Sequence, residues 1–243
     1  MAKNKTDRPA KRASDKPVSP ARSDVDAFLA QVRVRPATTH AAGQGRLIFA
    51  MDATMSRQPT WDRACNLQAE MFNETARIGG LSVQLVYFRG FRECRASRWV
   101  GDAAALADLM VRVDCRGGHT QIGRTLNHVR KEAKKAKVNA VVYVGDCMEE
   151  NVDDLCAAAG ELGLLGVPLF MFQEGHDPVA QGAFKELARL TGGAYCGFDA
   201  SSVRQLRELL SAVAVYAAGG RKALTAVAGS KKATAKLLLE QLG

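Results

Sequence analysis

The sequence predicts an α/β protein in which a doubly wound, mostly parallel sheet is covered by helices on both faces. From residue 45 onward, short apolar segments typical of buried strands alternate with longer segments of helical periodicity. Glycine and proline turns separate these segments. Two of the strongest strands are followed at once by an aspartate, Asp52 and Asp146. In open α/β sheets, side chains at such strand ends lie at the ligand-binding edge.

The predicted strands are short apolar runs, as expected of central parallel strands. The strand at 93–99 is expected to be a short antiparallel strand at one edge. In chain order the predicted strands are 46–51, 81–88, 93–99, 139–144, 166–172 and 194–196.

The predicted helices carry apolar residues at helical spacing, and several end at paired glycines. Gly79-Gly80 ends the first of them and Gly192-Gly193 the fifth, while Ser201 or Ser202 is a suitable N-cap for the last. In chain order these helices are 59–78, 103–113, 122–135, 152–162, 179–191 and 202–217.

The net charge of +9 is concentrated at the two ends of the chain. Residues 1–22 carry seven Lys/Arg against two Asp and almost nothing apolar, so we expect a disordered basic tail. A short helix and a linker are expected at 23–44, then one domain at 45–217. Residues 218–243 form a second basic tail with a short amphipathic helix near its end. The body between the tails is close to neutral.

The compartment is predicted from the cysteines and the N-terminus. None of the six cysteines forms a Cys-x-x-Cys pair, and reduced thiols in a cytoplasmic protein are the expected state. No apolar segment follows the charged N-terminus, so we expect no signal peptide. The longest apolar run, at 162–172, is too short to cross a bilayer.

Three loops bring oxygen-bearing side chains to the predicted ligand-binding edge. The first strand ends in Asp52-x-Thr54-x-Ser56, Thr120 lies in a glycine-rich loop, and Asp146 follows the strand at 139–144. Carboxylates and hydroxyls are the hard ligands that Mg²⁺ prefers. The sequence therefore predicts one divalent-cation site, for Mg²⁺ or Mn²⁺, formed by all five residues.

This pattern resembles the metal-ion-dependent adhesion site (MIDAS) of von Willebrand factor type A (VWA) domains, and the resemblance covers residues 45–217. The segment 188–195 is also similar to a late helix-to-strand segment of that family. The resemblance implies that Thr54 and Ser56 bind the metal directly. It implies that Thr120 binds directly in one state, and that Asp52 and Asp146 act mostly through water.

Several neighbours of the predicted site depart from the family pattern or compete with it. Cys147 stands where a glycine is usual, and Glu149 or Glu150 could crowd or occupy the site. His119, beside Thr120, could touch a ligand, although an exposed loop histidine is the favoured interpretation. Thr120 and Asp146 could each instead cap a following helix.

The resemblance implies an intracellular, divalent-cation-dependent protein-binding module and not an enzyme. The bound metal would take an Asp or Glu carboxylate of a protein partner, with an assembly run by an AAA+ ATPase as one setting. A nucleic-acid-associated protein that uses its basic tails is the second hypothesis. A metal-dependent hydrolase with Glu149 or Glu150 as the general base is the third. No phosphate-binding loop, catalytic triad or membrane span is found in the sequence.

Overall fold

The computed structural model describes residues 44–62, 64, 66, 73, 80–198 and 203–230. Six strands form one sheet in the order β3-β2-β1-β4-β5-β6. They are β1 (Gly45–Asp52), β2 (Leu81–Arg89), β3 (Glu93–Val100), β4 (Ala140–Gly145), β5 (Leu169–Glu174) and β6 (Ala194–Phe198). Only β3 runs antiparallel to its neighbour. The predicted mostly parallel sheet with one antiparallel edge strand is therefore confirmed.

The strand β1 lies at the centre of the sheet and pairs with β2 on one side and β4 on the other. The chain first moves outward from β1 to β2 and β3, then returns to the opposite side at β4. This reversal makes the carboxyl ends of β1 and β4 a topological switch point, the place where open α/β sheets bind ligands. Asp52 is the last residue of β1, and Asp146 follows β4 directly. The topology thus brings these two carboxylates to the same switch point.

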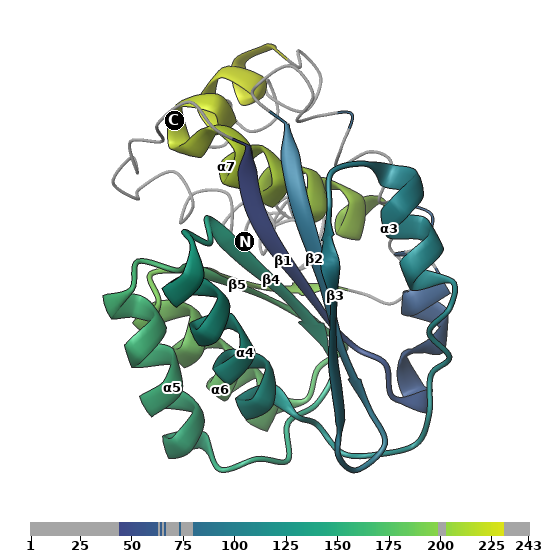
Figure 1. The fold of residues 1–243 in the computed structure, drawn as a ribbon. Coiled ribbons are helices and arrows are strands. Elements are labelled where there is room, and N and C mark those ends of the chain that lie inside the picture. The colour runs from purple at the N-terminus through teal and green to yellow at the C-terminus, as the bar shows by residue number, and fades with distance from the viewer. Residues whose placement is uncertain are drawn as a thin grey trace, which may run out of the picture.

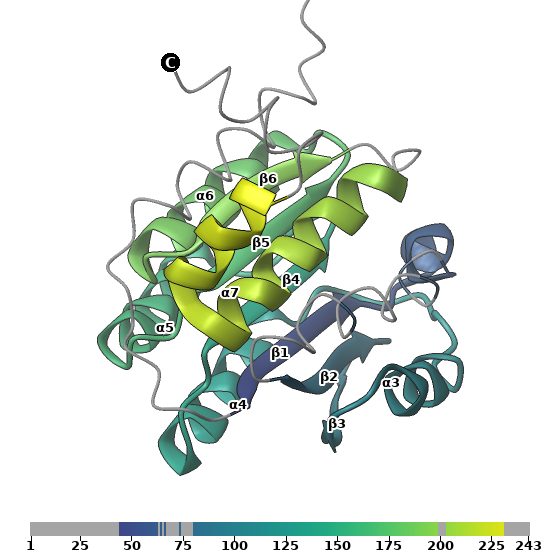
Figure 2. The ribbon, with the colours of Figure 1, turned by 90° about the horizontal axis from the view of Figure 1, so that it is seen from above.

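Helices cover both faces of the sheet (Figure 1). The helices α4 (Ile122–Lys135), α5 (Val152–Leu164) and α6 (Pro178–Leu190) pack on one face. The helices α3 (Ala103–Met110) and α7 (Val203–Ser230) pack on the other, together with a segment that begins with the 3-10 helix η1 (Met55–Arg57). Figure 2 shows α7 lying across the sheet on the face opposite α5 and α6.

The alternation of side chains along β1 divides the core into two layers. Ile48 and Ala50 point into the layer beneath α4, α5 and α6, whereas Leu47 and Phe49 point into the layer beneath α3 and α7. All four are buried, so β1 is apolar on both faces, as a central parallel strand must be. Truncating Phe49 to alanine would cost about 3–5 kcal/mol.

Three helix starts are fixed by side-chain caps. Asp102, Asn151 and Asp177 each accept a hydrogen bond from a backbone N–H in the first turn of α3, α5 and α6 respectively. Each cap of this kind is worth about 1 kcal/mol. The helices α3, α5 and α6 follow the strands β3, β4 and β5, so each cap also fixes where the loop from strand to helix ends.

The last helix differs from its prediction. The α7 range contains two helical segments, because the helical geometry is broken at Gly220, which has φ 65° and ψ −164°. The first segment thus ends close to the expected residue 217, and the second, which continues to Ser230, was not predicted. The predicted helix at 59–78 is only partly described, and it starts at Gln58. The expected helix within 23–44 and the one near 233–242 lie outside the described residues, so the predicted limits of the two tails stay predictions. In the part of the chain that is described, no helix has the length and apolar character that crossing a membrane requires.

Candidate metal centre

Asp52 is fully buried at the carboxyl end of β1. Its Oδ1 accepts a hydrogen bond from the backbone N–H of Thr54 at 2.7 Å, which turns the chain away from the sheet. Its Oδ2 is buried and has no hydrogen-bond partner. Burial raises the pKa of Asp52 from 3.8 to about 6, against the lowering effect of the hydrogen bonds with Thr54. One carboxylate oxygen is therefore left without compensation at this position.

Ser56 joins the end of β1 to the loop after β4. Its hydroxyl donates a hydrogen bond to Asp146 Oδ2 at 2.8 Å, and it lies 3.4 Å from the hydroxyl of Thr54. The second oxygen of Asp146, Oδ1, is buried and has no partner. Four of the five predicted ligands therefore lie in one continuous cluster, with two unpartnered carboxylate oxygens.

Thr120 reaches this cluster through the loop that carries Asp146. The backbone N–H of Thr120 donates to Glu149 Oε2 at 3.0 Å, and the backbone N–H of Glu149 donates back to the Thr120 hydroxyl at 3.1 Å. Thr120 is buried. Among the described residues, no hydrogen bond joins it directly to the other four predicted ligands. The structure thus places Thr120 beside the loop of Asp146, and its role as a ligand stays a prediction.

The two glutamates after Asp146 hold the Thr120 loop and the start of α4. Glu149 Oε2 also lies 2.9 Å from His119 Nδ1. Glu150 accepts the backbone N–H groups of Ile122 and Gly123, the latter at 2.9 Å. A carboxylate at a helix N-terminus is favoured by the exposed N–H groups and the helix dipole. Both side chains therefore have structural partners, and neither binds in the cluster of Asp52, Ser56 and Asp146.

The helix caps also bear on the simpler interpretations of Thr120 and Asp146. The N-cap of α4 is Gln121, which makes no side-chain capping bond, and the first turn is held by Glu150 instead. The N-cap of α5 is Asn151. Neither Thr120 nor Asp146 is a helix cap, so capping does not explain why these two residues lie at this edge.

Sequence reasoning missed a buried ion pair beside the cluster. Arg57, directly after Ser56, is only 1% exposed and forms an ion pair with Glu174, the last residue of β5. The hydroxyl of Thr60 donates to the same carboxylate. The sequence could have indicated that Glu174 lies near this site, because Glu174 ends a parallel strand at the same edge as Asp52. The partner could not be read from the sequence, since 117 positions separate Arg57 from Glu174.

Charge in the cluster is unevenly balanced. Burial lowers the pKa of Arg57, and the nearby carboxylates of Asp146 and Asp52 act in the opposite direction. Nε and Nη2 of Arg57 have no partner. The hydroxyl of Tyr143 on β4 is also buried without a partner, and burial raises its pKa well above the usual value. Arg57 is bound to Glu174, so the charges of Asp52 and Asp146 are only partly offset.

The donor set fits a hard divalent cation. Two carboxylates with an unpartnered oxygen each and two adjacent hydroxyls are the chemistry that Mg²⁺ and Mn²⁺ favour. Within the described residues, no three His, Cys, Asp or Glu side chains gather as a metal site. A site here would thus depend on the hydroxyls of Thr54 and Ser56 as well as on the carboxylates.

Solved structures resemble this chain although its sequence does not match known families. No family model and no curated protein matches it. A von Willebrand factor type A protein from Catenulispora acidiphila has a TM-score of 0.59 at 15% identity, covering 71% of this chain and 43% of that one. The SpRpn10 VWA domain has a TM-score of 0.54 at 12% identity, covering 69% and 94%. This chain has a VWA-type fold.

A third similar structure bears on the metal. Proximal thread matrix protein 1 from the mussel byssus, with a zinc-occupied MIDAS motif, has a TM-score of 0.56 at 16% identity, covering 72% of this chain and 49% of that one. This chain thus spans less than half of that protein and of the Catenulispora protein. At these identities the likeness shows the VWA fold alone.

One departure from the VWA pattern can now be placed. Cys147, where a glycine is usual, is half-buried beside Asp146. Burial, followed by the charge of Asp146, raises the pKa of its thiol to about 12. A thiol with so high a pKa stays protonated at neutral pH, and only the thiolate is a good nucleophile or metal ligand. In the absence of a metal, Cys147 is therefore a neutral thiol that fills space beside the cluster.

Proposed function

We propose that this VWA domain is a divalent-cation-dependent protein-binding module. In this proposal Thr54, Ser56 and Thr120 hold the metal through their hydroxyls, and Asp52 and Asp146 act mainly through bound water. The observation that carries the proposal is the pair of buried, unpartnered oxygens, Asp52 Oδ2 and Asp146 Oδ1. Burying carboxylate charge without compensation costs several kcal/mol, and a divalent cation would offset that cost.

The geometry supports recognition over catalysis. The metal would supply an open coordination position that a carboxylate of another protein can fill. A hydrolase would also need a general base beside the reacting water, and Glu149 and Glu150 were the candidates. Both accept backbone N–H bonds that hold the Thr120 loop and α4. Their engagement there supports a non-enzymatic role for the domain.

Mg²⁺ or Mn²⁺ is the proposed metal, inside a reducing compartment such as the cytoplasm. Hydroxyl and carboxylate oxygens favour these ions over softer ones. Among the described residues the cysteines at 94, 115, 147 and 156 are free, which supports a reducing environment. The proposal needs no contribution from the basic tails, so nucleic-acid binding through them is a separate outcome to be tested.

The test is metal binding followed by metal-dependent capture. Mn²⁺ binding is measured by electron paramagnetic resonance, and Mg²⁺ by its competition with Mn²⁺. We expect Asp146→Ala to weaken binding at least tenfold, whereas Asp153→Ala, an exposed aspartate in the first turn of α5, leaves it unchanged. No binding by the full chain at millimolar metal, or equal loss in both variants, contradicts the proposal.

Capture from a cell lysate then identifies the partner class. The immobilised chain is exposed to the lysate with Mg²⁺ and, in parallel, with a chelator. Proteins retained only with Mg²⁺ and lost in Asp146→Ala support the proposal, and an AAA+ ATPase among them supports that setting. Nucleic acid retained equally in chelator, and released by salt or by deletion of residues 1–22 and 219–243, supports the tail hypothesis.

A further inference from the structure

The tip of the β2–β3 hairpin carries an exposed aromatic ring next to the candidate metal centre. Gly90, with φ 59°, makes the turn, and Phe91 follows it with 73% of its surface exposed. The ring of Phe91 contacts the ring of His119 edge-on, with centroids 5.2 Å apart. His119 directly precedes Thr120, so this apolar contact surface adjoins a predicted metal ligand.

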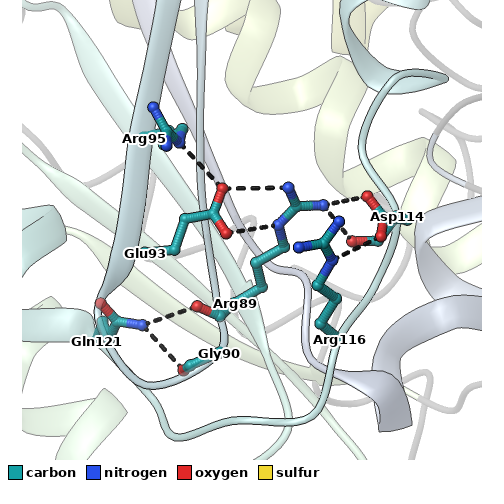
Figure 3. Close-up of polar contacts among 7 residues, drawn as sticks. All are labelled: Arg89, Gly90, Glu93, Arg95, Asp114, Arg116 and Gln121. Atoms are coloured by element: carbon teal, nitrogen blue, oxygen red, sulfur yellow. Dashed lines mark hydrogen bonds and ion pairs between the residues drawn. The ribbon is translucent and has the colours of Figure 1, made fainter.

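Backbone contacts tie the hairpin tip firmly to the Thr120 loop. The backbone N–H of His119 donates to the Gly90 carbonyl at 3.2 Å. The side-chain amide of Gln121 donates to the carbonyls of Arg89 and Gly90, both at 3.2 Å (Figure 3). A Cβ on Gly118 would lie only 2.1 Å from the Gly90 carbonyl oxygen, so the two backbones are in close contact. The tip and the Thr120 loop therefore hold a fixed relative position.

The hairpin tip is strongly basic. Arg89 pairs with Glu93 at 3.0 Å and also with Asp114, as Figure 3 shows. Each of these carboxylates also pairs with a further arginine, Arg95 at 3.0 Å and Arg116 at 2.7 Å. The hydrogen bonds from Arg116 and Arg89 hold the pKa of Asp114 at about 2. Three arginines thus share two carboxylates and leave an excess of positive charge.

Two further arginines add to that excess. Arg92, next to Phe91, and Arg124, on the first turns of α4, are both exposed. The guanidinium of Arg124 donates to the backbone carbonyl of Arg92 at 2.9 Å, so the two residues are neighbours. No ion pair with a described carboxylate involves either side chain. With Glu149 beside His119 included, the tip presents five arginines against three carboxylates.

We propose that this hairpin-tip surface, formed by Phe91, His119 and arginines 92, 95, 116 and 124, is a second contact for the partner of the metal centre. It selects a carboxylate that lies within an acidic segment carrying a large apolar side chain. The inference rests on the proposed function for the position of that carboxylate. The positive charge attracts the segment, and Phe91 packs against its apolar residue.

Charge excludes one other occupant, the chain itself, because residues 1–22 and 219–243 are basic and would be repelled by this surface. A nucleic acid would bring a continuous line of phosphates past Glu149, which lies 2.9 Å from His119. A protein segment can instead place one carboxylate at the candidate metal centre, its remaining acidic residues beside the arginines and an apolar side chain on Phe91. An acidic peptide segment is therefore the occupant that fits best.

The probes are fluorescent peptides with one central aspartate, in acidic, neutral or lysine-rich surroundings and with either phenylalanine or alanine beside it. Anisotropy is measured on the full chain with saturating Mn²⁺ and with a chelator. We expect the acidic, phenylalanine-containing peptide to bind at least tenfold more tightly than the neutral one. Its affinity should fall with rising salt, because the attraction is between exposed charges.

Two variants and two matched controls locate the contact. Phe91→Ala should weaken binding of the best peptide about tenfold, and Arg92→Glu about fivefold through lost attraction and new repulsion. Arg98→Glu, on β3 further from the tip, and Leu164→Ala, exposed at the far end of α5, should leave it unchanged. All four should bind Mn²⁺ as the unaltered chain does.

The outcomes separate this inference from the proposed function. Metal-dependent binding that is equal for acidic and neutral peptides, or unaffected by both variants, overturns the hairpin-tip surface and leaves the metal-dependent function standing. Acidic peptides that bind equally in chelator, yet weaken in Arg92→Glu, support the surface and contradict the metal bridge. A single-stranded oligonucleotide that binds more tightly than every peptide, and depends on Phe91, overturns the choice of occupant.

Discussion

Replacing Asp52 by asparagine should stabilise the metal-free protein and remove its response to metal. Burial raises the pKa of Asp52 from 3.8 to about 6 in the folded state. The folded protein thus binds this proton more tightly than the unfolded chain does. Stability is therefore lost as pH rises from about 4 to about 6, and the whole loss is present at pH 7. The shift corresponds to roughly 3 kcal/mol.

Asparagine keeps the shape and the acceptor for Thr54 N–H but carries no charge. Its amide would lie where Oδ2 has no partner, which costs about 1–3 kcal/mol and cancels part of the gain. We expect a net stabilisation of up to about 2 kcal/mol at pH 7, or up to roughly 8 °C in Tm for a chain of this size. At pH 4 the gain should disappear, because Asp52 is then protonated in the unaltered protein.

The assay is thermal unfolding at pH 4 and pH 7, with chelator and with Mg²⁺. Metal at a hundred times its Kd should stabilise the unaltered chain by about 2.7 kcal/mol and the variant by much less, so the order of the two proteins reverses. Asp108→Asn, an exposed change on α3, is the control. The reasoning is refuted if Asp52→Asn is the less stable protein in chelator at pH 7, or if its gain is equal at both pH values.

Three further outcomes follow from the same geometry. Because metal binding must displace the proton of Asp52, whose pKa is about 6, the Kd for Mn²⁺ should rise about tenfold between pH 7 and pH 5; a flat calorimetric profile contradicts this. Gly118→Ala should destabilise the fold by about 1–3 kcal/mol in urea, since its Cβ would clash with the Gly90 carbonyl, whereas Gly117→Ala, with open space around it, should not. Glu150→Ala removes the acceptor of two N–H groups in the first turn of α4 and should cost about 1–3 kcal/mol by the same measurement; an unchanged unfolding midpoint would show that this carboxylate does not hold the helix.

The order of the strands explains why the sequence was informative about the site. Parallel strands with their carboxyl ends at one edge bring Asp52 and Asp146 together whatever the details of the loops. The hydroxyls of Thr54 and Ser56 follow Asp52 within one turn, so their positions were fixed by local chain geometry. The structure accordingly brings these four residues into one cluster.

Contacts between distant segments were the part that the sequence could not predict. Glu149 and Glu150 were expected as neighbours or competitors of the metal, yet both hold the Thr120 loop and α4 through backbone N–H groups. Their position just after Asp146 in the sequence predicted that they lie near the candidate site. The direction of each side chain depends on where α4 begins, which is set by the packing of the fold.

The sequence by itself determined the fold class, the edge of the sheet that carries the site, and the oxygen-bearing residues there, because these depend on periodicity and strand direction. Tertiary structure alone decided that Arg57 is buried against Glu174 and that Phe91 lies on His119 beside the candidate metal centre. The physical reason is that each of these contacts joins loops from separate strands. Their relative positions are set by the packing of the whole sheet and its helices.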